Sequence, residues 1–419
     1  MPSTVRKSTT PPRVPLASEW RRNQIAATAA SFIGFTGFTI VMPFLPIYIT
    51  QLGVADVGTA AIWAGLSLGV TPAVTALLMP AWGRVADRFG RKLMVERSLL
   101  SFVVIMSAMA YVTQPWHLFA LRTIQGLFAG YGALTLAMAA ESAPRERMAD
   151  AIGMVQTAQR LGPALGPIIG GIVAELVGLR RAFFVTAGFY AVAFVLVLAM
   201  YRERPAAART AAAASRVRLG EVVRLPNFLL LIALLFGLQF VDRSFGPVLP
   251  LYLVEIGAAD GRVPLVTGVL VSVLACAAAA GNHLCGYLLR RYTARAVIIG
   301  GAGCAAAGVV GFTLVPELTV MAVAMGVFGA GVGTAMTAAY TAAASVIPEG
   351  MHGTAFGVLT SGALAGLALS PIASGFIGST SIRTVFVCDV LILIALGMAV
   401  RRLMIETRGT TSAPAAEDA

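Results

Sequence analysis

The stretch PFLPIYITQLG at residues 43–53 is repeated as PVLPLYLVEIG at residues 247–257, 204 positions further along the chain. The identical pairs are Pro43 and Pro247, Leu45 and Leu249, Pro46 and Pro250, Tyr48 and Tyr252, and Gly53 and Gly257. The same offset aligns Pro144, Ala151, Gly153, Gly162, Ala164, Pro167 and Gly171 with Pro348, Ala355, Gly357, Gly366, Ala368, Pro371 and Gly375. One constant offset in two separate regions indicates that the chain consists of two homologous halves.

The composition is that of a membrane protein. Hydrophobic residues make up 58% of the 419 residues and charged residues only 12%, whereas about a quarter of the residues in a soluble domain are charged. Apolar segments of about 20 residues recur along the chain, which is the length that a helix needs to cross a bilayer. They are too long and too continuous for the alternating strands of a barrel. We expect twelve spans, at residues 25–49, 61–82, 94–112, 116–140, 151–175, 182–201, 227–253, 264–289, 296–315, 317–342, 352–379 and 384–403.

An Arg- and Ala-rich segment at residues 202–226 separates the first six expected spans from the last six. The sequence therefore predicts an all-α membrane protein with twelve transmembrane helices in two pseudo-symmetric six-helix bundles. The expected parts are a leader (1–24), a first bundle (25–201), the linker (202–226), a second bundle (227–403) and a tail (404–419). The leader has no cleavage pattern of small residues behind a short apolar core, so we expect the first span to be retained.

Charge predicts the orientation. Of the 31 lysines and arginines, 24 lie in or beside the segments on one side of the predicted membrane, four lie on the other side, and three lie within spans. Cytoplasmic loops carry this excess of positive charge, so we expect the leader, linker and tail in the cytoplasm and the protein in the inner or plasma membrane. The net charge of +12 is thereby explained by topology, and we expect no nucleic-acid partner.

The sequence offers no site for catalysis or for a metal. The cysteines Cys276, Cys285, Cys304 and Cys388 lie in apolar stretches without ligand spacing, and buried packing is their expected role. The chain has three histidines, and it has neither a nucleophile–base pattern nor a phosphate-binding loop. We therefore expect neither an enzyme nor a bound cofactor, and nothing in the sequence requires more than a monomer.

The segment GRVADRFGRK at residues 83–92, expected as a loop between the second and third spans, concentrates five charges. It resembles the G-x-x-x-D-R-x-G-R-[RK] signature of the major facilitator superfamily, whose twelve-span fold the whole chain would share. The matching residues are Gly83, Asp87, Arg88, Gly90, Arg91 and Lys92. The resemblance implies that Asp87 latches the two bundles in an outward-facing state; alternatively, these charges only set the topology. The equivalent segment at residues 286–295 lacks the acid.

The fourth span contains LRTIQG, which is similar to the R-x-x-Q-G pattern of proton-coupled members of this superfamily. The matching residues are Arg122, Gln125 and Gly126. Arg122 and Gln125 are three positions apart and therefore share one helix face. An arginine within a span normally faces a polar interior rather than lipid. The alternative is that Arg122 extends its side chain to the nearer membrane surface.

The fifth span resembles the glycine signature of antiporters in this superfamily. The matching residues are Gly153, Gly162, Gly166, Pro167, Gly170 and Gly171. Small residues at this spacing form a groove for a neighbouring helix, and ordinary close packing is the alternative interpretation. Together with the two preceding motifs, this one makes the chain resemble the twelve-span drug:proton antiporters.

A proton-driven antiporter needs a group that titrates within the membrane, and Asp242 in the seventh span is the clearest candidate. Its neighbour Arg243 need not pair with it, because consecutive helical residues point about 100° apart. We include Arg122, Gln125, Arg160 and Arg243 as further proton-coupling candidates. The alternative is a structural acid paired with Arg122 or Arg160. Of the other titratable residues, Glu141, Glu175 and Asp389 are expected at membrane surfaces, and His283 is a weaker proton candidate.

The first span has no acidic residue, and the spans carry three arginines against one central aspartate. This balance favours neutral, zwitterionic or weakly acidic amphiphilic substrates over lipophilic cations. The candidates for lining the cavity are Phe38, Met42, Phe236, Gln239 and Phe240, together with Phe35 and Phe245.

We therefore predict a secondary active transporter that exports small amphiphilic compounds, as in multidrug efflux, by proton antiport with alternating access. Its partners are then the substrate, protons and the lipid bilayer, with the proton gradient as energy source. An exporter of a sugar, siderophore or other metabolite would share these motifs. A channel or a non-transporting membrane protein is the remote alternative, and it would not explain the duplicated halves.

Overall fold

The computed structural model describes residues 17–144, 147–203, 224–257, 262–347 and 352–405. Every element in these ranges is a helix, as predicted. The first half contains α1 (Ala17–Ile40), α2 (Leu45–Gln51), α3 (Val57–Phe89), α4 (Arg91–Met109), α5 (Pro115–Phe128), α6 (Tyr131–Ser142), α7 (Met148–Val177) and α8 (Leu179–Met200). The second half contains α10 (Phe228–Glu255), α11 (Val263–Leu288), α12 (Ala294–Leu314), α13 (Leu318–Val346), α14 (His352–Gly378) and α15 (Ile382–Leu403). Most of the predicted leader, linker and tail lies outside the described residues.

Ten helices within the described ranges are long and apolar enough to cross a membrane, and α1 and α2 make an eleventh if this pair, bent by 44°, is counted as one span. The helix α4 is not among them because four charges occupy its first two turns: Arg91, Lys92, Glu96 and Arg97. The all-helical membrane class is therefore confirmed. The full count of twelve spans remains a prediction.

Two expected spans are broken, and one expected loop is helical. The first span breaks at residues 41–44, where Pro43 lacks the N–H that a continuous helix would use. The fourth breaks at Gly130, whose φ of 112° is a conformation that favours glycine. The expected loop 83–92 is wrong: α3 continues to Phe89, α4 begins at Arg91, and Gly90 alone turns the corner with φ 105°.

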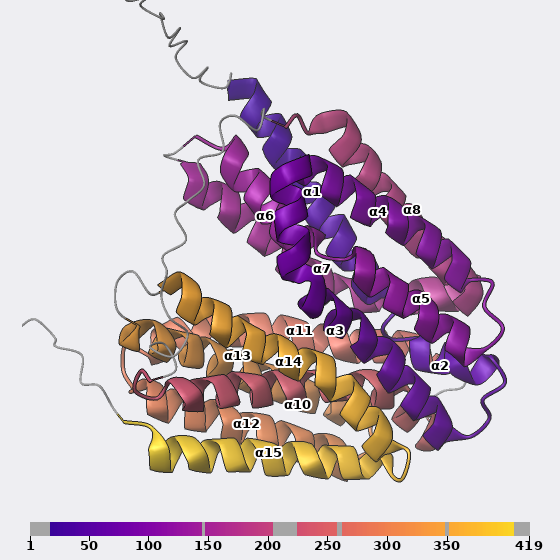
Figure 1. The fold of residues 1–419 in the computed structure, drawn as a ribbon. Coiled ribbons are helices and arrows are strands. Elements are labelled where there is room, and N and C mark those ends of the chain that lie inside the picture. Colours follow the sequence, from indigo (N-terminus) through magenta and orange to yellow (C-terminus); the bar gives the residue numbers. More distant parts are fainter. Residues whose placement is uncertain (1–16, 145–146, 204–223, 258–261, 348–351, 406–419) are drawn as a thin grey trace, which may run out of the picture.

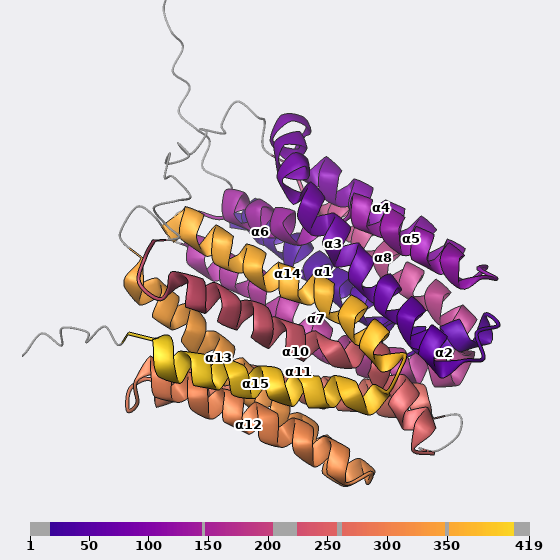
Figure 2. The same cartoon turned by 60° about the horizontal axis from the view of Figure 1, so that its bottom comes forward.

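The helices of each sequence half pack together, so that the structure has two groups of helices (Figure 1). The groups meet near α2 and diverge toward the side on which α1 begins and α15 ends (Figure 1), and in the rotated view the two groups overlap (Figure 2). The main contacts between the two halves are those of α3 with α14 and of α7 with α11. The halves are thus joined at one end of the molecule.

Within each half, glycines allow two helix backbones to touch at equivalent positions. A Cβ atom on Gly162 of α7 would lie 2.8 Å from the backbone nitrogen of Thr36 in α1. A Cβ atom on Gly366 of α14 would lie 3.2 Å from the backbone nitrogen of Phe240 in α10. Both members of the second contact are 204 positions after those of the first. The offset found in the sequence is therefore also present in the packing.

The contacts between the halves are also made by glycines at positions that repeat with the offset of 204. A Cβ atom on Gly171 of α7 would lie 2.7 Å from the Cα atom of Leu265 in α11. A Cβ atom on Gly375 of α14 would lie 2.5 Å from the carbonyl oxygen of Ala61 in α3. Leu265 and Ala61 are again 204 positions apart. Small residues let membrane helices approach closely enough for backbone contact, so these glycines determine how the halves meet.

We expect the substitution Gly170→Val to destabilise the protein by about 1–3 kcal/mol, because overpacking forces helices apart. A Cβ atom at Gly170 would overlap the backbone of Ile40 in α1. The matched control is Gly188→Val in α8, where no atom lies within 4 Å of the added Cβ. The check is the thermal unfolding midpoint of both variants in detergent. Equal midpoints would contradict this account of the α1–α7 contact.

Candidate functional site

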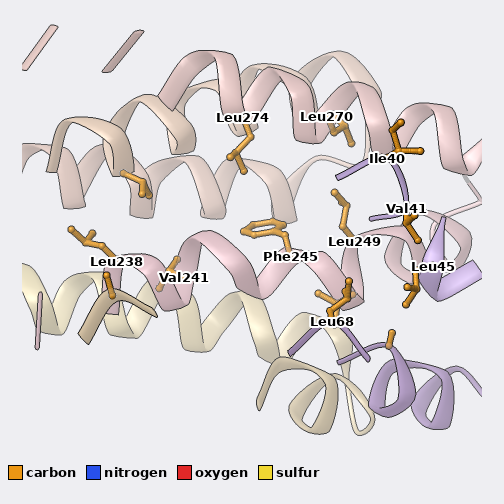
Figure 3. Packing of buried hydrophobic residues seen from close by; sticks show 14 of the residues in the cluster. Ile40, Val41, Leu45, Leu68, Leu238, Val241, Phe245, Leu249, Leu270 and Leu274 are labelled. Atoms are coloured by element: carbon orange, nitrogen blue, oxygen red, sulfur yellow. The ribbon is translucent and has the colours of Figure 1, made fainter. Parts of the chain in front are cut away.

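Apolar side chains close the space between the halves at the end where they meet. This apolar seal consists of buried residues from five segments: Ile40 and Val41 at the end of α1, Leu45 in α2, Leu68 in α3, Leu249 in α10 and Leu270 in α11 (Figure 3). The break after α1 places Val41 and Leu45 beside α10. Gly246 of α10 faces Leu68, since a Cβ atom there would lie in ordinary contact with Leu68 Cδ1, at 3.5 Å.

Polar contacts accompany the apolar seal at the same end. The backbone N–H of Ile168 in α7 donates to Ser272 Oγ in α11 at 3.2 Å. Arg262 Nε, at the start of α11, lies 3.9 Å from Glu175 Oε1 in α7. Glu175 is therefore near the end of its helix, as expected, and it contacts the other half. Exposed ion pairs of this kind stabilise a protein by little, so the packed helices close this end.

The individual contacts described between α7 and α11 lie at residues 167–175 of α7 and 262–272 of α11. Arg160 lies seven residues before Pro167 and eleven before Gly171, so it occupies the face of α7 that contacts α11. His283 occupies the corresponding face of α11, eleven residues after Ser272. Both side chains are exposed. Each of the two helices thus presents one exposed basic residue on the face that, further along, contacts the other helix.

A groove of about 710 Å³ lies between α1 and α7 on the open side. Its lining is mostly apolar, with two threonines and one carboxylate: Ile25, Thr28, Ala29, Phe32, Asp150, Gly153, Met154, Thr157, Ala158 and Leu161. No atom of the described residues lies within 4 Å of a Cβ placed on Gly153. The glycine motif of α7 is therefore divided: Gly153 faces open space, the next three glycines contact α1, and Gly171 contacts α11.

The arginine and glutamine of the fourth span are buried together in the first half. Arg122 is 2% exposed, and its Nη1 donates to Gln125 Oε1 at 3.1 Å. Thr71 Oγ1 of α3 donates to the Arg122 carbonyl at 2.9 Å. The guanidinium does not reach a membrane surface, as the alternative interpretation required. No described residue accepts from Arg122 Nε or Nη2.

Two tyrosines that the sequence argument did not single out lie close to this pair. Tyr131 of α6 and Tyr190 of α8 both contact the ring of Phe102, at centroid distances of 6.0 and 5.1 Å. Neither hydroxyl group has a hydrogen-bond partner among the described residues. Gly34 makes room for Tyr131, since a Cβ atom there would lie 2.8 Å from its hydroxyl. Unpaired buried donors are rare and mark places for water or a polar ligand.

Asp242 and Arg243 of α10 form an ion pair. Arg243 Nε lies 3.1 Å from Asp242 Oδ2, and their side chains are 35% and 14% exposed. Adjacent helical residues need not pair, but these two do. Asp242 makes no ion pair with Arg122 or Arg160 in the described part of the chain. Arg160 projects from α7 without a described ion-pair partner.

Asp389 of α15 is the acid that the sequence argument misplaced. It was expected at a membrane surface, yet it is only 1% exposed, and its Oδ2 lies 2.6 Å from Ser244 Oγ of α10. The helical spacing held a signal, because Asp389 lies on the buried stripe of its helix. The buried residues of that stripe are Ile382, Val385, Phe386, Asp389, Leu393 and Val400.

The predicted cavity residues are all half-buried, and they come from two segments: Phe38 and Met42 around the end of α1, and Phe236, Gln239 and Phe240 in α10. The rings of Phe236 and Phe240 are 6.0 Å apart. None of the five lines the α1–α7 groove. Phe35 packs against Tyr131. The assignment of Phe245 to the cavity is wrong, because it is 3% exposed and packs against Phe312, Phe328 and Phe386.

The charged corner between α3 and α4 is bound to its own half. Arg91 Nη1 lies 2.9 Å from Glu141 Oε1 of α6, so Glu141 is paired rather than free at the surface. The Arg91 backbone N–H donates to Glu203 Oε1 at 2.6 Å, and Lys92 Nζ donates to the Leu198 carbonyl at 3.1 Å. Gly90 makes the turn, and Arg88 lies against the Phe89 ring. The side chain of Asp87 and the surroundings of Gly83 are outside the described part of the chain.

The sequence profile of the Major Facilitator Superfamily matches residues 27–319 and 243–419. Proteins named multidrug resistance protein MdtG from Proteus mirabilis and Citrobacter koseri are 31% and 34% identical over 269 and 272 residues, which is 63% and 64% of this chain. Each alignment covers 66% of the relative, slightly less than two thirds of its length.

Solved structures share the fold at low sequence identity. A bacterial homolog of the human lysosomal transporter Spinster, in an inward-facing and occupied conformation, has a TM-score of 0.80 and 17% identity, covering 93% of this chain and 98% of that one. A D-xylose-proton symporter has a TM-score of 0.74 and 15% identity, covering 94% and 100%. Both similarities concern the arrangement of helices.

We expect a cysteine at position 157, in the α1–α7 groove, to react much faster with a membrane-impermeant thiol reagent than one at position 272. Thr157 is exposed, whereas Ser272 is buried where α7 and α11 touch. The variants Thr157→Cys and Ser272→Cys would be compared in a background with the four native cysteines replaced. The readout is the labelling rate in membranes. Equal rates would show that the groove is not open to water.

Proposed function

Because the chain belongs to the major facilitator superfamily, we propose that it is a secondary transporter that exports small amphiphilic compounds in exchange for protons. The observation that carries the proposal is the asymmetric contact between the halves. They are sealed at one end by buried apolar side chains, and the described contacts of α7 with α11 lie at that same end. Rocking of one half against the other around a central site is the general mechanism of transporters built from repeats.

We assign the chain twelve spans in two six-helix bundles, covering residues 25–201 and 227–403. The bent pair α1–α2 and the charged helix α4 supply the two spans beyond the ten that composition identifies. The assignment is supported by the glycine contacts that repeat with an offset of 204. On this assignment, each bundle moves as one body.

The excess of Lys and Arg in the leader, linker and tail supports cytoplasmic termini. In this orientation α1, α7 and α10 begin at the cytoplasmic surface. The apolar seal then lies toward the outer surface, and the α1–α7 groove opens toward the cytoplasm. The conformation is accordingly one that accepts substrate from inside the cell, as an exporter requires.

The multidrug resistance relatives support a drug-like substrate class, and the local chemistry narrows it. The first span has no acid to attract a cation, while Arg122 is buried and Arg160 is exposed within the spans. We therefore favour neutral, zwitterionic or weakly acidic amphiphiles. Phe38, Met42, Phe236, Gln239 and Phe240 are our candidates for the cavity wall.

We propose that Asp242 exchanges a proton during transport and that Arg243 is its counter-ion when it is ionised. Their pair lies in α10, a helix that also contacts α3 and α2 of the other half. Motion between the halves can therefore change the surroundings of the pair. Arg122, Gln125 and Arg160 are proposed as the basic and polar groups that respond to the proton exchange at Asp242.

We retain Asp87 as the proposed latch of the outward-facing state.

The test of the function is export from cells that produce the protein. Cells with the gene should accumulate less of a neutral fluorescent amphiphile than cells without it, and a protonophore should remove the difference. A parallel panel of metabolites and cationic dyes would show whether the substrate class is wrong. Export that continues unchanged with the protonophore present would contradict proton coupling.

We expect Asp242→Asn to abolish exchange driven by a pH gradient in proteoliposomes, because the amide cannot exchange a proton. The control is Asp150→Asn at the groove rim, where the carboxylate is exposed and should leave the pH dependence intact. The measurement is dye movement after an imposed pH step. Unchanged coupling in Asp242→Asn would remove this residue from the mechanism.

A further inference from the structure

At the contact between α10 and α15, the Ser244 hydroxyl group lies close to two oxygen atoms. If Asp389 is ionised, both of these oxygens can only accept a hydrogen bond. Ser244 Oγ lies 2.6 Å from Asp389 Oδ2 and 2.9 Å from the carbonyl oxygen of Val241. A hydroxyl group has one hydrogen and can donate it to only one of these oxygens. With a carboxylate at position 389, one of the two short oxygen–oxygen contacts would have no hydrogen.

A proton on Asp389 resolves both contacts. The Asp389 O–H then donates to Ser244 Oγ, and Ser244 donates its own hydrogen to the Val241 carbonyl. The distances of 2.6 and 2.9 Å fit this chain, since hydrogen bonds between oxygen atoms are commonly 2.5–3.0 Å long. Hydrogen bonds in such chains strengthen one another.

The surroundings offer Asp389 no counter-ion. It is 1% exposed, and its Oδ1 has no hydrogen-bond partner among the described residues. The helices packed against α15 are α10, α12 and α14. Their described titratable groups, with those of α15 itself, are Asp242, Arg243, Tyr252, Glu255, Arg295, Cys304, Arg383, Cys388, Arg401 and Arg402. No ion pair joins Asp389 to a described residue, and Arg243 is paired with Asp242. An unpaired buried charge is costly, so a neutral carboxyl fits this site.

We infer that the Asp389 carboxyl is a proton-binding site of the second half, occupied in this conformation through the chain Asp389–Ser244–Val241. The proton comes from water and adds to one carboxylate oxygen. Nothing is oxidised or reduced. This site is distinct from the Asp242–Arg243 pair: Asp242 and Ser244 are two positions apart and therefore face about 200° apart around α10.

The position of Ser244 links the bound proton to movement of α10. Pro247 has no N–H, so the carbonyl of Arg243 has no helical partner beside Ser244. Beyond this weak point, α10 carries Leu249 of the apolar seal and contacts α3. Loss of the proton would turn the Ser244 hydroxyl from Val241 toward Asp389 and leave a buried charge. We propose that proton release therefore accompanies bending of α10, a role that rests on the antiport proposed above.

The occupancy of the site is tested by infrared spectroscopy of the purified protein, with and without ¹³C-labelled aspartate. We expect a carbonyl band of a protonated aspartic acid at neutral pH. It should be absent in Asp389→Asn, shifted to higher frequency in Ser244→Ala, and retained in the control Asp242→Asn. Thermal unfolding of each variant checks that it folds. The absence of the band in the wild-type protein, or its retention in Asp389→Asn, would overturn the inference.

The coupling role is tested by dye exchange at different pH values in proteoliposomes. We expect Asp389→Asn to keep exchange at equal pH and to lose its acceleration by a pH gradient. If the band belongs to Asp389 but the variant keeps normal pH dependence, the proton is structural and the coupling role is wrong. If the wild-type protein moves no dye, the proposed transport function fails while the infrared result on Asp389 still stands.

Discussion

Backbone contact between helices is the constraint on which this structure depends. Lipid is as apolar as the helix surfaces, so the helices are held by close packing rather than by escape from water. Glycines on α7 and α14 provide that packing, and Gly171 and Gly375 extend it to the opposite half. Because these contacts are made by bare backbone, the two halves meet on smooth, rigid surfaces. Such surfaces can separate as units without disturbing the packing inside either half.

The duplicated glycines also explain how much of the fold could be predicted. Spacing alone located the helix contacts, because a glycine groove requires small residues at fixed intervals and little else. The helix corners were harder. Gly90 and Gly130 each turn the chain with a single positive φ, and nothing in their neighbouring residues distinguishes them from glycines inside a helix, such as Gly188. A glycine that permits a turn does not require one, so the breaks depend on tertiary packing.

The same limit applies to the polar residues of the site. The motif in the fourth span contains Arg122 and Gln125, and their three-residue spacing predicted a shared helix face, on which they form a hydrogen bond. The burial of Asp389 does not follow from its distance to the end of the span, because burial depends on the helix face that the residue occupies. The convergence of Tyr131 and Tyr190 on Phe102 could not be predicted, because no pattern in the sequence indicates which aromatic residues of three different helices meet. Side-chain burial is a property of the packed bundle, and a single span does not determine it.

The buried polar groups are divided between the halves in a way that suits an exchanger. The first half holds the basic Arg122 without a described acidic partner, and the second holds the acidic Asp389 without a described basic one. A buried ion pair that is enclosed by its own half, without contact to the other half, would keep the same surroundings in every conformation. An unpaired group, by contrast, is sensitive to any movement that admits water or changes its neighbours. Ser244, which contacts Asp389, and Leu249 of the apolar seal both belong to α10. A movement of α10 at the seal would therefore also move the hydrogen-bond partner of Asp389.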